Sequence, residues 1–188
     1  MDLIANYLHR LYLETPACYL SWPAVAMVAG TILAAISPRL AARLGVTPRR
    51  PAGLPGIVTA PFIHANAAHL TANLAPFLVL GALVLRRDEA RFIEVFATIA
   101  LTQGALVWLC GRNAAHVGMS GVIFGFLGYL LAAGWFTRTT SDLLVAGGVM
   151  LAYGGLLAGV KPARGGTSWE GHLLGLFAGI ARAWFDLG

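Results

Sequence analysis

A serine and four histidines fall within or beside the long apolar segments of this 188-residue sequence. Together with one asparagine they form three clusters along the chain: His64, His69 and Asn73; His116 and Ser120; and His172. Ionisable side chains are costly in a lipid environment, so each one inside an apolar segment is a functional candidate. A serine hydroxyl becomes a nucleophile when a base accepts its proton, and a neutral imidazole is the usual base. Ser120 with a histidine partner could therefore carry out nucleophilic, hydrolytic chemistry.

Each cluster also has a plainer structural interpretation. The small residues of Gly118-Met-Ser-Gly121 could serve packing alone, because they let transmembrane helices approach closely. Ser120 could simply cap the helix that it begins. His69 and Asn73 are four residues apart, share one helix face and could hydrogen-bond across a bundle. A histidine at a membrane edge, such as His116, is more often a satisfied interfacial group than a catalyst.

The composition indicates that the solvent of this chain is lipid. The sequence is 58% hydrophobic and 11% charged, with a mean hydropathy of +0.74. A soluble domain has roughly 25% charged residues, so a soluble enzyme is excluded. The net charge of +5 comes from basic residues scattered singly between apolar runs, which argues against nucleic-acid binding.

Six apolar segments approach the ~20 residues needed to cross a hydrocarbon core. We expect an all-α polytopic membrane protein, with a six-helix bundle over residues 16–188 and spans at about 17–36, 62–85, 92–110, 119–136, 143–160 and 171–187. Residues 1–15 predict an amphipathic segment at the membrane surface. Residues 37–60 predict a long loop rich in arginine and proline, and Pro76 is expected to weaken or bend the second span.

The order of the spans brings the three clusters to one membrane face. The second, fourth and sixth spans run in the same direction, so their first turns lie in one layer. Small residues at Gly121 and Gly125, and at Gly175 and Gly179, would let the fourth and sixth spans pack closely. Such packing would bring the Ser120 hydroxyl within hydrogen-bond reach of the His172 imidazole.

We expect a serine–histidine dyad, because no carboxylate is placed to complete a triad. Glu170 is only two positions from His172, which puts it off that helix face, and we expect it to be a solvated interfacial group. A zinc site is disfavoured, since His64 and His69 are five residues apart and no cysteine or carboxylate joins them.

The residues resemble the rhomboid family of intramembrane serine proteases over about residues 61–181. The matching motifs are His64-Ala-Asn-Ala-Ala-His69-Leu-Thr-Ala-Asn73, Gly118-Met-Ser120-Gly121 and Gly171-His172-Leu-Leu-Gly175-Leu-Phe-Ala-Gly179. Each motif is weak alone, but the three occur in order on alternate spans. Many rhomboids also carry a Trp-Arg pair in the first loop, which residues 53–64 lack. That departure concerns the packing of the loop rather than the chemistry.

The resemblance implies a role for each motif residue. Ser120 would be the nucleophile and His172 the general base, while His69, Asn73 and the Ser120 backbone N–H would bind the oxyanion. His64 would have a supporting role. The aromatic ring of the residue at position 124 (Phe124) would stack on the catalytic histidine, and Gly118 and Gly121 would support the serine turn.

The resemblance also implies partners and a location. The substrates would be transmembrane segments of membrane proteins within the lipid bilayer, cleaved without a cofactor at a site that opens to the extracytoplasmic side. A minimal bacterial member of the cell membrane with cytoplasmic termini fits the six spans, although the arginines do not indicate the orientation. The sequence carries no sign of an oligomeric state.

Two other functions were weighed against an endopeptidase. A rhomboid-like protein could bind membrane helices without cutting them. Such proteins lack the serine or the histidine, whereas this chain has both Ser120 and His172. A small transporter or channel would need polar residues along a path across the bundle, whereas here they gather near one face.

Overall fold

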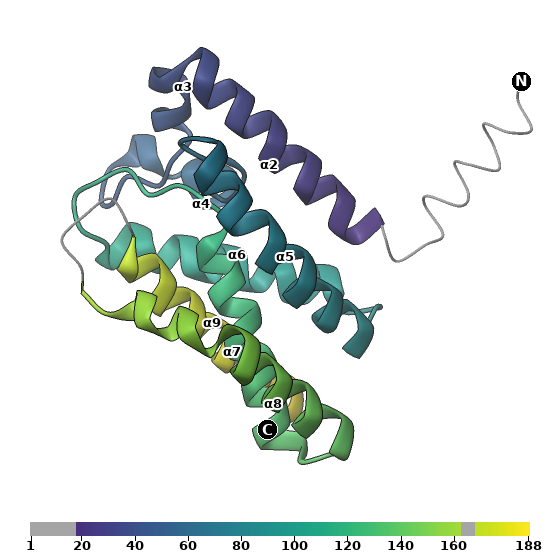
Figure 1. Ribbon diagram of the computed structural model, residues 1–188. Helices are drawn as coiled ribbons and strands as arrows, with labels where there is room; N and C mark the ends of the chain where they lie inside the picture. Colours follow the sequence, from purple (N-terminus) through teal and green to yellow (C-terminus); the bar gives the residue numbers. More distant parts are fainter. Residues whose placement is uncertain (1–17, 163–167) are drawn as a thin grey trace, which may run out of the picture.

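The computed structural model describes residues 18–162 and 168–188, and these form a helical bundle (Figure 1). Its long helices are α2 (Cys18–Ile36), α5 (Ala67–Arg87), α6 (Phe92–Cys110), α7 (Ser120–Thr137), α8 (Thr140–Tyr153) and α9 (Trp169–Leu187). The 3-10 helix η3 (Gly154–Val160) continues α8. The predicted amphipathic segment 1–15 lies outside the described residues. The all-α fold class predicted from the sequence is confirmed for the residues described.

The chain is a multi-pass membrane protein. Among the described residues, five helices are long and apolar enough to cross a membrane: α2, α5, α6, α7, and α8 together with η3. The sixth predicted span corresponds to α9, which carries three charged residues, Glu170, Arg182 and Asp186. The predicted count of six crossings is therefore not confirmed.

Helix α7 forms the centre of the bundle. Every residue from Gly121 to Leu130 is buried, as expected for a helix that is apolar all round. Helix α9 packs along α7, while α6 and α5 contact other faces of α7 and α2 lies at the edge beside α5 (Figure 1). Both functional clusters on α7 and α9 thus belong to the two most intimately packed helices.

Glycines make the close crossing of α7 and α9 possible. A Cβ added at Gly175 would overlap the carbonyl oxygen of Gly121, and one at Gly179 would overlap that of Gly125. The backbones therefore touch without intervening side chains, which is the packing that the small-residue spacing predicts.

At the far end of these helices, charged side chains form pairs in which a largely buried group meets a more exposed one. The Arg91 guanidinium lies 2.8 Å from the Asp186 carboxylate, and Arg182 lies 2.8 Å from Glu94. The Tyr129 hydroxyl donates to Asp186 over 3.3 Å. Because these residues come from α6, α7 and α9, the pairs hold the helix ends that lie farthest from Ser120 and His172.

Two of the predicted spans differ from the helices that the structure shows. Helix α5 begins at Ala67 rather than at Phe62, because extended Asn66 caps it and accepts from the His69 N–H over 2.8 Å. Pro76 lies within this single continuous helix. The last predicted crossing before α9 is helical from Thr140, but it narrows to a 3-10 helix after Tyr153.

The segment predicted as a long loop is folded into short helices. These are α3 (Pro38–Arg43), η1 (Pro51–Gly53), α4 (Gly56–Thr59) and η2 (Ala60–Phe62). Helix α4 packs closely on α6, where a Cβ at Gly104 would meet Ile57. Prolines at the first position of α3 and η1 favour such short turns.

Candidate active site

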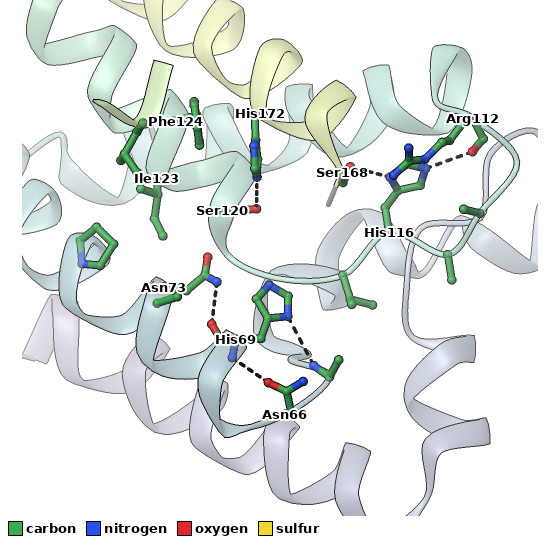
Figure 2. Close-up of a pocket in the computed structure, with 17 residues that line it drawn as sticks. Asn66, His69, Asn73, Arg112, His116, Ser120, Ile123, Phe124, Ser168 and His172 are labelled. Atoms are coloured by element: carbon green, nitrogen blue, oxygen red, sulfur yellow. Dashed lines mark hydrogen bonds between the residues drawn. The ribbon is translucent and has the colours of Figure 1, made fainter. Parts of the chain in front are cut away.

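Ser120 and His172 contact each other at the N-terminal ends of α7 and α9. Ser120 is the first residue of α7, and His172 lies in the first turn of α9. The Ser120 Oγ is 2.9 Å from the His172 Nε2 (Figure 2). The glycine contacts between α7 and α9 are what allow this approach, since a bulkier residue at Gly175 would separate the helices.

A backbone carbonyl orients the His172 ring. The His172 Nδ1 lies 3.0 Å from the carbonyl oxygen of Gly159 in η3. A carbonyl can only accept, so Nδ1 carries the ring proton and Nε2 of the neutral ring is left to accept from Ser120. The Phe124 ring stacks on a face of the His172 ring, with ring centroids 4.2 Å apart and an interplanar angle of 6°.

A cavity of about 640 Å³ opens beside the Ser120 hydroxyl. Its polar lining includes Ser120, His172, His69 and Asn73, and most of the remainder is apolar or small, as at Ile123. Figure 2 shows His69 and Asn73 on α5, across the cavity from Ser120. Asn73 donates one of its two amide hydrogens to the His69 carbonyl over 2.8 Å, and its buried Oδ1 has no hydrogen-bond partner among the described residues.

His64 lies behind this cavity rather than in it. Its side chain is fully buried, its ring meets the His69 ring edge-on at 5.0 Å, and its Nε2 accepts from the Met119 N–H over 3.4 Å. Gly118 passes close by with a φ of +110°, and a Cβ there would lie 2.8 Å from the His69 Nε2. Both the conformation and the contact require glycine at this position.

A second serine–histidine contact borders the cavity. The His116 Nδ1 lies 2.6 Å from the Ser168 Oγ, and the His116 Nε2 lies 3.0 Å from the Arg112 carbonyl oxygen. Ser168 caps α9 by accepting from the Gly171 N–H over 3.2 Å. His116 is therefore a buried, hydrogen-bonded residue of the site's wall.

The prediction that Glu170 is a solvated interfacial group was wrong. Glu170 is buried, and its carboxylate lies 3.6 Å from the Arg112 guanidinium, because the first turn of α9 is covered by the segment that follows α6. It does not complete a triad, since the His172 Nδ1 is occupied by the Gly159 carbonyl.

Known proteins resemble this chain over most of its length. Residues 52–188 match the family model described as the Rhomboid domain. The chain belongs to the rhomboid family. All three sequence motifs, from His64 to Gly179, lie within the matched residues.

Relatives of this rhomboid occur in mycobacteria and in a plant. An uncharacterized protein of Mycobacterium tuberculosis is 40% identical over 149 residues, which are 74% of this chain and 62% of the relative. An uncharacterized protein of Mycobacterium leprae is 43% identical over 138 residues, covering 69% of this chain and 55% of the relative. The chloroplastic Rhomboid-like protein 11 of Arabidopsis thaliana is 30% identical over 142 residues, 68% of this chain and 50% of that protein. The match to this rhomboid thus spans between half and two thirds of these relatives.

Two contributors to the rhomboid site were not found from the sequence. The Gly159 carbonyl carries no sequence signal, because any residue supplies a backbone oxygen. Ser168 does carry one, since serine directly before an apolar helix is a common N-cap, but its contact with His116 depends on the tertiary fold.

The burial of His64 predicts an acid-sensitive fold. The pKa of His64 is lowered from 6.5 to about 4, chiefly by burial and also by the adjacent His69, while a hydrogen bond with the Phe62 backbone opposes the shift. The unfolded chain therefore binds more protons than the folded chain as the pH falls. The contribution of His64 to the free energy of unfolding is complete above pH ~6.5 and is lost as the pH falls toward about 4. We expect the thermal midpoint in detergent to fall less steeply across this range in His64→Gln than in the wild type. Parallel curves for the two proteins would contradict this assignment.

Proposed function

We propose that this rhomboid is an intramembrane serine endopeptidase that cleaves transmembrane segments of membrane proteins through a Ser120–His172 dyad. The observation that carries the proposal is the 2.9 Å contact between the Ser120 Oγ and the His172 Nε2 at a cavity with a largely apolar lining. A lining of this kind suits an apolar peptide segment.

In the proposed reaction, the His172 Nε2 takes the Ser120 proton while the Oγ attacks the carbonyl carbon of the scissile bond. The tetrahedral intermediate collapses as the imidazolium gives that proton to the leaving amine, which frees the first product and leaves an acyl ester on Ser120. Water then attacks the ester while His172 takes its proton. When the second tetrahedral intermediate collapses, the imidazolium returns that proton to the Ser120 Oγ and the second product leaves as the acid. The Gly159 carbonyl accepts from the Nδ1–H of both the neutral ring and the imidazolium, so the neutral ring always presents Nε2 to Ser120.

The oxyanion would be held by three donors. The Ser120 N–H is at the first residue of α7, where backbone N–H groups have no acceptor within the helix. The His69 imidazole and the second amide hydrogen of Asn73 supply the others from the α5 wall. Donors that are fixed before the reaction stabilise the developing charge without reorganisation.

The proposal is tested by reconstituting the protein in liposomes with a panel of single-span membrane proteins and weighing the products by mass spectrometry. We expect defined cleavage within or beside the transmembrane segment, and covalent labelling of Ser120 by a fluorophosphonate probe. Binding of the panel proteins without cleavage or labelling would instead indicate a non-proteolytic rhomboid-like protein.

Removing an oxyanion donor should reduce turnover more than substrate binding. For Asn73→Ala we expect a kcat lower by roughly 10²- to 10³-fold with little change in KM, because the lost interaction forms in the transition state. The matched control is Asn113→Ala, which removes an exposed asparagine from the segment before His116 and should leave kcat unchanged. An equal rise in KM with constant kcat for Asn73→Ala would contradict the oxyanion role.

A further inference from the structure

Two serine–histidine contacts lie side by side at the open end of α7 and α9, at matching offsets. His116 precedes Ser120 by four residues, and Ser168 precedes His172 by four residues. Figure 2 shows both contacts on the wall of one cavity. The dyad accounts for one of them, and the 2.6 Å contact between His116 and Ser168 has no part in the proposed chemistry.

The partners of His116 fix the direction of its hydrogen bonds. The Arg112 carbonyl can only accept, so the His116 Nε2 carries the proton and Nδ1 accepts from the Ser168 hydroxyl. The Ser168 Oγ in turn accepts from the Gly171 N–H, and the His172 N–H donates to the Ser168 carbonyl over 3.2 Å. A chain of hydrogen bonds thus runs from the Arg112 carbonyl through His116 and the Ser168 hydroxyl to the Gly171 N–H, and the Ser168 carbonyl separately accepts from the His172 backbone.

The backbone of the same segment is anchored on its other side. His116 and Val46 exchange two backbone hydrogen bonds of 2.9 Å, and the Gly118 N–H donates to the Ala60 carbonyl over 2.8 Å. The segment that carries Ser120 is therefore held against the short helices before α5. His116, which is buried, is the point where this anchored segment reaches across to α9.

The glycine crossing alone does not determine where the first turns of α7 and α9 lie. Gly121 and Gly125 set how closely the two helix axes approach, but smooth glycine faces offer no side chain that fixes the helices against sliding or rotation. At the cavity end, the His116–Ser168 hydrogen bond and the longer 3.6 Å Arg112–Glu170 pair join the segment that carries Ser120 to the first turn of α9.

We propose that His116 and Ser168 are positioning residues whose hydrogen bond sets the separation of the Ser120 Oγ and the His172 Nε2. This inference rests on the proposed function. A displacement of about 1 Å between reacting groups can cost roughly 100-fold in rate. Loss of the His116–Ser168 bond should therefore lower turnover while leaving the substrate cavity able to bind.

The variants His116→Phe and Ser168→Ala, and the double variant, test this directly. Fluorophosphonate labelling gives the number of active sites, so kcat is expressed per reactive serine. We expect each single variant to lower kcat by about 10- to 100-fold with KM nearly unchanged. The double variant should fall no further than the lower single one, because both substitutions break the same bond. Ser168→Thr, which keeps the hydroxyl, should restore most of the rate.

Thr139→Ala is the matched control. Thr139 caps α8 through the Asp142 N–H as Ser168 caps α9 through the Gly171 N–H, but it lies at the other end of the bundle. If Ser168→Ala lost activity only because a helix cap was removed, Ser168→Ala and Thr139→Ala would both have a lower thermal midpoint and fewer labelled sites, and kcat per labelled site would not change. That result, independent effects in the double variant, or labelling of Ser168 itself would overturn the positioning role. Cleavage that persists in Ser120→Ala would instead overturn the proposed function.

Discussion

Replacing Ser120 with alanine is expected to abolish cleavage of a transmembrane reporter while leaving the protein folded. The hydroxyl is the only nucleophile placed 2.9 Å from the His172 Nε2 among the described residues. Removing a catalytic nucleophile typically costs 10⁴-fold or more in kcat, with the remaining rate supplied by binding and oxyanion stabilisation. We therefore expect a loss of at least roughly 10⁴-fold, measured from product formed in liposomes.

The fold should tolerate this substitution for a specific reason. Met119, not Ser120, is the N-cap of α7, and no side chain caps that helix, so removing the Ser120 hydroxyl removes no cap. The thermal midpoint of Ser120→Ala should stay close to that of the wild type. Ser141→Ala, at an exposed serine in the first turn of α8, is the control and should retain full activity.

The dyad further predicts that the two losses do not add. His172→Ala should be as inactive as Ser120→Ala, and the double variant should be no worse, because the two groups act as one unit. Substantial cleavage by either single variant would exclude the mechanism.

The second large effect is expected from filling the crossing of α7 and α9. In Gly179→Ala the new methyl group would overlap the Gly125 carbonyl oxygen, and in Gly175→Ala it would overlap that of Gly121. Both obstacles are backbone atoms of a buried helix, so the helices must move apart. Overpacking of this kind costs about 1–3 kcal/mol, which for a chain of this size lowers the thermal midpoint by roughly 3–10 °C.

The same substitution on a free helix face is the control. A Cβ at Gly148 of α8 meets nothing within 4 Å, so Gly148→Ala should leave the midpoint unchanged or raise it slightly. Gly175→Ala should also lose most of its activity, because separating α7 from α9 separates Ser120 from His172. Equal midpoints for Gly179→Ala and Gly148→Ala would show that the close crossing does not stabilise the fold.

The reaction centre proposed for this rhomboid uses a backbone carbonyl where soluble serine hydrolases often use a carboxylate. The Gly159 carbonyl receives the His172 Nδ1 proton, and Phe124 covers the ring. A neutral acceptor avoids burying another charge in an apolar bundle, where an unpaired carboxylate would be costly. Glu170, which is buried nearby, is paired with Arg112 instead.

Several features of this chain follow from local patterns of residues. Apolar length separated the membrane helices from the connecting segments, and the direction of alternate spans assigned His64, His69, His116 and His172 to one layer. Glycine spacing predicted the close crossing of α7 and α9, because each glycine pair recurs on one helix face at i and i+4. These properties follow from residues close together in the chain.

The tertiary fold sets which distant segments share hydrogen bonds. The tertiary fold places His64 outside helix α5, because Asn66 caps α5 two residues later. It also turned Glu170 inward toward Arg112 and brought the Gly159 carbonyl to His172. A hydrogen bond needs two groups within about 3 Å, and the pairing of His116 with Ser168, 52 residues away, is set by the packing of whole helices rather than by either local sequence.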